Sequence, residues 1–178
     1  MASGMSPKDA PIGDVSAALA VVDSHLKRFG TDQATAGRDE LLTQYMGSLG
    51  RGGASDVLDG ACTLLYVFMQ WLRSAHESQD KDVLEYVLPY VVGTLKHMRT
   101  VSDEGIPTMA AMMTASVVDV SPSLWRHELG SWRREEMTAF EVTLFILARR
   151  INELCGDENA ATQMVIEALD AAEDGEPE

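Results

Sequence analysis

The hydrophobic residues of this chain recur at every third or fourth position, and this spacing constrains the fold more than any other feature. The clearest case is the segment 135–155, whose apolar positions advance by four, three, four and three residues: Phe140, Leu144, Leu147, Ile151 and Leu154. That step matches the roughly 3.6 residues of an α-helical turn, so one face of the segment is apolar. Alternating β-branched runs, which indicate strands, are absent from the sequence. We therefore predict an all-α fold.

The same spacing predicts a single domain of about six to eight helices. The expected helices are Val15–Phe29 with Asp14 as N-cap, Asp32–Leu49, a helix capped by Ser55 or Asp56, 80–100, a short helix with Ser121 as N-cap and Pro122 as its first residue, 135–155 and 158–172. A methionine-rich segment, 108–118, follows the helix at 80–100. Within the third of these helices, Gly60–Leu72 is apolar on nearly every side. A helix without a polar face belongs in the middle of a bundle. We expect the helices at 80–100 and 135–155 to pack against it.

Glycine and proline mark the places where helices are expected to stop or bend. A flexible hinge is predicted at the glycines 47, 50, 52 and 53, because glycine costs about 1 kcal/mol relative to alanine in a helix. Pro89 predicts a kink or a break, since proline lacks the N–H that bonds to the carbonyl four residues earlier. These signals divide the chain into a flexible leader (1–12), a helical domain (13–172) and an acidic tail (173–178).

The charge of the chain argues against one class of partner. The sequence contains 28 acidic and 14 basic residues, a net charge of −14. Nine of the acids, and neither Lys nor Arg, lie from Ile151 to the end. Nucleic-acid binding needs a cation for each phosphate contact, so direct binding to nucleic acid is not expected.

Two further features bear on location and redox chemistry. The longest uncharged runs, Gly60–Leu72 and Ile106–Val118, have 13 residues each, fewer than the roughly 20 that span a membrane. The N-terminus has no basic segment before an apolar one, so we expect a cytoplasmic protein. Cys62 and Cys155 lack the spacing of zinc or redox motifs and are interpreted as buried free thiols.

The last predicted helix has two unlike faces. Its apolar side is formed by Met164, Val165, Ala168, Leu169 and Ala172, and its acidic side by Glu167, Asp170, Glu173 and Asp174. The apolar side should dock on the body and the acids should face outward. A carboxylate row of this kind could contact a basic protein partner, or it could simply be a solvated face that aids solubility.

A second candidate contact lies on the helix at 135–155. Val142 and Ile146 are one turn apart on the side away from the main apolar stripe, between charged residues. An apolar pair in this position needs a cover. The cover is either another helix of the same chain or a second copy of the protein in a symmetric dimer.

A cluster of methionines supports an alternative function. Met109, Met112 and Met113, with Met98 before them and Trp125 after them, could form an adaptable apolar pocket for a small molecule. The pocket would lie between the helix at 80–100 and the methionine-rich segment. Filling gaps in the core is the competing interpretation of the same residues.

Catalytic motifs are missing from the sequence. The histidines 25, 76, 97 and 127 are dispersed, and neither HExxH nor an acid three residues before a histidine occurs. GRGG at 50–53 is a weak match to an anion-binding loop. We predict no cofactor, no metal and no catalytic residue. The preferred function is a noncatalytic protein-interaction or regulatory module, such as an antitoxin, immunity protein or inhibitor; the alternatives are a small-molecule sensor or carrier, and a helical enzyme whose histidines and carboxylates are brought together by folding.

Overall fold

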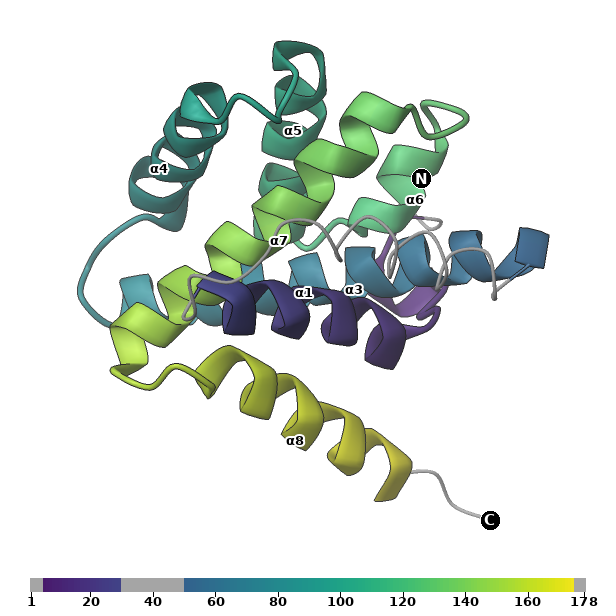
Figure 1. Cartoon of the computed structure of the whole chain (residues 1–178). Helices are drawn as coiled ribbons and strands as arrows, with labels where there is room; N and C mark the ends of the chain where they lie inside the picture. Colours follow the sequence, from purple (N-terminus) through teal and green to yellow (C-terminus); the bar gives the residue numbers. More distant parts are fainter. Residues whose placement is uncertain (1–4, 30–49, 175–178) are drawn as a thin grey trace.

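The computed structural model describes residues 5–29 and 50–174, and this part of the chain is all-α (Figure 1). Its α-helices are α1 (Val15–Phe29), α3 (Gly50–Glu77), α4 (Val83–His97), α5 (Ile106–Val117), α6 (Pro122–His127), α7 (Arg134–Cys155) and α8 (Ala160–Asp174). Two short 3-10 helices, Pro7–Asp9 and Asp103–Gly105, complete the described elements, and no strand occurs among them. The predicted fold class is confirmed. The helix expected at Asp32–Leu49 falls outside the described residues.

Helix α3 is the centre of the bundle, as its apolar sequence predicts. It packs against α1, α4, α5, α6, α7 and α8, and it crosses the middle of the molecule in Figure 1. Its fully buried side chains are Leu64, Leu65, Phe68, Met69 and Leu72. Neighbours on every side explain why this helix can do without a polar face.

The start of α3 differs from the prediction. The helix begins at Gly50, not after a cap at Ser55 or Asp56, so the hinge expected at Gly50, Gly52 and Gly53 is wrong for these three positions. Gly47 lies outside the described residues. The cost of glycine in a helix is about 1 kcal/mol per residue, and the packing of a 28-residue helix can outweigh that cost.

Two caps predicted from sequence are present. Asp14 Oδ1 accepts a hydrogen bond from the Ala17 N–H at 2.9 Å, at the start of α1. At the start of α6, Ser121 Oγ accepts from the Leu124 N–H at 3.2 Å, and Pro122 is the first helical residue. In both caps, the side-chain oxygen accepts a hydrogen bond from an N–H group of the first turn that has no acceptor within the helix.

Helix α4 continues through Pro89 without a break. Proline here removes one hydrogen bond to the Glu85 carbonyl, but Glu85 and Pro89 are both exposed, so water can replace the missing donor. The inner side of α4 is a stripe of four buried residues, Val83, Val87, Val91 and Leu95. Burial of this stripe holds the helix against α5 and α7 on both sides of the proline.

The segment before α1 lies close to the body. Ile12 O accepts a hydrogen bond from Thr63 Oγ1 at 3.1 Å, and Met5 O accepts one from the Ser121 N–H at 2.7 Å. The described part of the expected leader, residues 5–12, therefore contacts both α3 and the start of α6.

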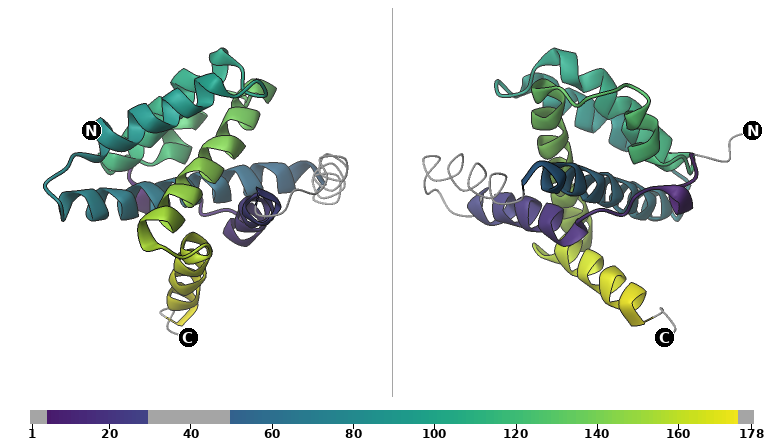
Figure 2. Two further views of the ribbon diagram at one scale, coloured as in Figure 1. Left: turned by 60° about the vertical axis from the view of Figure 1, so that its left-hand side comes forward. Right: turned by 90° about the vertical axis from the view of Figure 1, so that its right-hand side faces the viewer.

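Helix α8 extends away from the other helices, with the C-terminus at its far end (Figure 2). It is attached to α7 through Asn152, whose side-chain oxygen accepts from the Ala161 N–H at 2.8 Å. Ala161 and Val165 are its buried residues. In the described ranges, no helix has both the length and the apolar character needed to cross a membrane.

Candidate functional site

The residues of the predicted ligand pocket fill the core. Met109, Met112 and Met113 are 0 % exposed, while Met98 and Trp125 are partly buried against the same core. The pockets described below are lined by other residues. The three buried methionines therefore favour the competing interpretation, in which they fill gaps in the core, and a ligand pocket at these residues stays a prediction.

The apolar pair on α7 is also internal. Val142 and Ile146 are 8 % and 5 % exposed, so they form no surface for a second copy or another protein. The cover comes from the same chain, which is one of the two alternatives left open by the sequence. The reason is that α7 crosses the bundle and packs against α1, α3, α4 and α5, so both of its apolar sides are covered.

The structure describes the side chains of only two of the four acidic residues predicted to face outward on α8. Glu167 and Asp170 are exposed, as the helical pattern predicts, and the neighbouring Ile166 is 45 % exposed. Glu173 and Asp174 end the helix, but their side chains lie outside the described residues. Helix α8 has no basic residue in its last turn.

The four histidines of the chain make four separate contacts. His25, on α1, is hydrogen-bonded to Glu141 on α7, and His127, on α6, lies 3.2 Å from Asp59 Oδ1 on α3. The other two bond to carbonyls of their own helices: His76 to Leu72 and His97 to Gly93. Folding thus brings two histidines next to carboxylates, but at different places in the bundle. Nowhere in the described structure do three His, Cys, Asp or Glu side chains meet in an arrangement suited to a metal ion.

A polar cluster joins α3 to α6. Asp59 is buried, and its Oδ1 accepts a hydrogen bond from Ser123 Oγ at 2.8 Å as well as facing His127. Burial raises the pKa of the nearby Cys62 thiol far above its usual range; the Asp59 carboxylate raises it further, and the Arg126 guanidinium opposes the rise. Cys62 is the buried free thiol that the sequence predicts, whereas Cys155, at the end of α7, is exposed. Ser123 is 2 % exposed and Asp59 is 8 % exposed, so their hydrogen bond lies inside the bundle, where it orients side chains of two helices.

A buried ion pair joins α6 to α7. Arg126 is 1 % exposed, and its Nη2 lies 2.5 Å from Glu136 Oε2. The guanidinium also donates to the carbonyls of Gly130 and Ser131 and lies 4.4 Å from the centre of the Trp132 ring. Its Nε, which is also buried, has no hydrogen-bond acceptor among the described residues.

Burial raises the pKa of Glu136, but hydrogen bonds from the Arg133 N–H, Arg126 and Thr108 outweigh burial, so the pKa lies below its ordinary value. The polar contacts of this carboxylate thus join α7 to α5 through Thr108, to α6 through Arg126 and to the residue before α7 through the Arg133 N–H. The carboxylate does not face an open surface, since Glu136 is 3 % exposed. We interpret the pair as structural.

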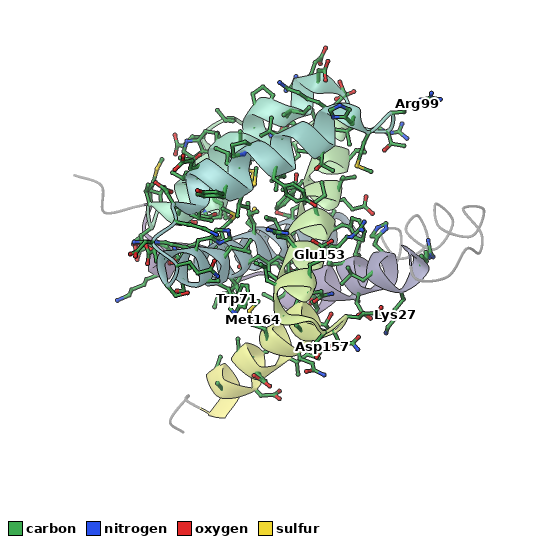
Figure 3. The ribbon with its side chains drawn as sticks, turned by 90° about the vertical axis from the view of Figure 1, so that its left-hand side faces the viewer. Lys27, Trp71, Arg99, Glu153, Asp157 and Met164 are labelled. Atoms are coloured by element: carbon green, nitrogen blue, oxygen red, sulfur yellow. The ribbon has the colours of Figure 1, made fainter. Side chains whose placement is uncertain are left out.

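One pocket in the described structure brings exposed aromatic side chains together. It has a volume of about 340 Å³ and lies between the second half of α3, the first half of α4 and the end of α7. Its walls include Trp71, Tyr86, Tyr90 and Leu154, and two cations, Lys81 and Arg150, also line it. Figure 3 faces this side of the molecule, with Trp71 and Glu153 labelled. We call this site the aromatic pocket.

The positions of these side chains follow from helical geometry. Tyr86 and Tyr90 are one turn apart on α4, on the side adjoining its buried valine stripe, and are 50 % and 44 % exposed. On α7, Arg150 and Leu154 are likewise one turn apart, and Leu154 is 42 % exposed. The side chains of residues four apart lie on the same helix face. Both pairs line the aromatic pocket, and Trp71 on α3 lines it as well.

The sequence alone gave weak signals for this site. Leu154 continues the stripe of α7 and is indistinguishable by spacing from the core residues before it. The usable signal was Tyr86 with Tyr90, two large aromatic residues four apart and outside the valine stripe of the same helix.

Two other hollows are more polar or more open. A groove of about 620 Å³ is lined by Arg73, Glu77 and Asp119 among others, and Arg73 bridges the two acids at 2.9 Å and 3.4 Å. A pocket of about 380 Å³ lies beside Gly13 and Leu169. Neither gathers several aromatic side chains. No protein-family model, no curated protein and no solved structure matches this chain.

Proposed function

We propose that the protein is a protein-interaction module that holds a segment of a partner protein in the aromatic pocket. The observation that carries this proposal is the meeting of three exposed large hydrophobic side chains, Tyr86, Tyr90 and Leu154, around one pocket. Tyrosine, tryptophan and arginine are the residues that most often dominate the binding energy of protein interfaces. The aromatic pocket contains all three types. In this proposal the protein acts by binding and performs no reaction of its own.

Two other exposed hydrophobic residues lie outside the aromatic pocket and apart from each other in the sequence. Val118 and Leu129 are 57 % and 55 % exposed, but the first follows α5 and the second follows α6. Hydrophobic residues that are exposed singly are ordinary on protein surfaces and need no explanation. An open cluster at the junction of three helices is a less usual arrangement, and burying it against a partner would be favourable.

The acidic side of α8 stays a prediction, and the proposal treats it as a second surface that can be tested separately. The double substitution Glu167→Gln with Asp170→Asn removes two exposed charges without shortening the helix. If binding to a partner is unchanged in this variant at low and at moderate salt, the acidic side is a solvated face. If binding weakens only at low salt, the acids attract a basic region of the partner.

The proposal is tested by selecting short random peptides from a displayed library against the full-length protein. Selected peptides are then synthesised with a fluorescent label, and their affinity is measured by anisotropy. We expect binding to weaken by about tenfold or more in Tyr90→Ala and in Leu154→Ala, because each removes a wall of the pocket. Leu129→Ala is the matched control, since it removes an exposed leucine outside the pocket.

Circular dichroism of each variant separates loss of the pocket from loss of the fold. Tyr90 and Leu154 are both more than 40 % exposed, so their removal should leave the helical signal unchanged. If no peptide is selected, or if the affinities for Tyr90→Ala, Leu154→Ala and Leu129→Ala are the same, the aromatic pocket is not the binding surface.

A further inference from the structure

We infer that the partner segment held in the aromatic pocket is acidic, with a carboxylate next to a large apolar side chain. This inference rests on the proposed function and adds the chemistry of the occupant. It begins with the charges that line the pocket. The fully charged side chains of the lining are Lys81 and Arg150, and no Asp or Glu belongs to it. In a chain with twice as many acids as bases, such a lining is a local reversal of charge.

Both cations are placed beside tyrosine rings. Lys81 Nζ lies 5.6 Å from the centre of the Tyr86 ring, and Arg150 Cζ lies 5.6 Å from the centre of the Tyr90 ring. Each pair therefore presents a positive group and an apolar surface side by side. A ligand that matches such a pair has a negative group adjacent to an apolar one.

The acids closest to these cations do not cancel them. Glu153 lies 3.4 Å from Arg150, but it also pairs with Arg149 at 3.2 Å, so one carboxylate is shared by two guanidinium groups. The polar contact of Lys81 in the described structure is neutral, to Gln79 Oε1 at 3.2 Å. Asp80 and Asp82 line the neighbouring groove of Arg73 and Glu77, which Lys81 also borders. The lining of the aromatic pocket itself therefore holds two cations and no carboxylate.

The size of the pocket and the charge of the whole molecule favour a short peptide segment over a long polyanion. About 340 Å³ accommodates one or two large side chains. A nucleic acid or an anionic membrane would extend beyond the two cations and meet a protein of net charge −14, which repels it. A peptide with few carboxylates can place one of them at Arg150 and its apolar neighbour between Tyr86 and Tyr90.

The test uses three synthetic peptides of one length on the full-length protein, measured by fluorescence anisotropy. The first has a Phe-Asp-Leu-Glu core, the second replaces its acids by Asn and Gln, and the third replaces them by Lys. We expect the acidic peptide to bind most tightly and to lose affinity as salt is raised. Arg150→Gln should weaken its binding by about tenfold. Arg149→Gln is the matched control, because Arg149 is adjacent, pairs with the same Glu153 and does not line the pocket.

The outcomes separate this inference from the proposed function. Equal binding of the acidic and the neutral peptide, or tighter binding of the basic one, overturns the acidic occupant, as does an equal effect of Arg149→Gln and Arg150→Gln. If peptides bind in a manner that depends on Tyr90 and Leu154 but not on carboxylates, the proposed function stands and this inference fails. Sedimentation that shows self-association abolished by Tyr90→Ala also overturns it, because a second copy then occupies the pocket.

Discussion

At the scale of single residues, the stability of the fold depends on the buried ion pair of Arg126 and Glu136. Each is at most 3 % exposed, so removing one charge leaves the other buried without its counterion. We expect Glu136→Gln to lower the free energy of unfolding by about 3 kcal/mol. Urea denaturation followed by circular dichroism measures this loss. Glu104→Gln is the control, because Glu104 is exposed and lies 3.8 Å from Arg133; if the two substitutions cost the same, the buried pair adds nothing beyond a surface contact.

The same carboxylate should make the stability depend on pH. The pKa of Glu136 lies below its ordinary value in the folded protein, so on acidification the unfolded chain binds the proton first, near pH ~4.3. The stabilisation is therefore complete above the unfolded pKa and is lost as the pH falls through the folded pKa. We expect the free energy of unfolding to fall less steeply with acidification in Glu136→Gln than in the wild type. Parallel pH profiles for the two proteins would contradict this assignment.

At the scale of elements, two glycines allow α1 to begin directly against α3. A side chain at Gly60 would place its Cβ 2.3 Å from Asp14 O, and one at Gly13, where φ is +65°, would place its Cβ 2.4 Å from Asp56 O. We expect Gly60→Ala to lower the free energy of unfolding by about 1–3 kcal/mol, because the backbone of α1 must move. Gly93→Ala on α4 is the matched control, since nothing lies within 4 Å of its Cβ. There the better helix propensity of alanine should raise stability by up to about 1 kcal/mol, as measured by thermal melting.

Contacts of this kind explain what the sequence could and could not predict. The caps at Asp14 and Ser121 each depend on residues three apart, so local sequence was sufficient to find them. The burial of Ile146 and the exposure of Leu154 both depend on where α7 lies among the other helices. Their spacing on the helix gives no such information.

The candidate site was missed for the same reason. Trp71, Tyr90 and Arg150 come from three helices, and their meeting is a consequence of how α3, α4 and α7 cross. Helical periodicity identifies which residues share a face of one helix. It does not identify which faces of different helices are left open together.

At the scale of the whole molecule, repulsion within a net charge of −14 should oppose folding. Substitutions of acidic residues in and next to α8 should show this effect most clearly. Asp170 lies towards the C-terminal end of α8, where the helix dipole is negative and the last turn has no basic residue. Asp157 precedes α8, and its Oδ1 accepts from the Asn159 N–H at 2.9 Å, so its charge lies near the favourable end. We expect Asp170→Asn to raise the melting temperature and Asp157→Asn to lower it, each by less than about 1 kcal/mol of stability.

The two substitutions change the net charge of the chain equally, so their comparison separates local from global repulsion. Added salt should raise the melting temperature of the wild type, because it screens repulsion among the exposed acids. It should also reduce the difference between Asp170→Asn and Asp157→Asn, since the interaction of each charge with the dipole is screened as well. If both substitutions raise the melting temperature by the same amount at low salt, the position of a charge along α8 is irrelevant, and the total charge of the molecule alone determines the effect.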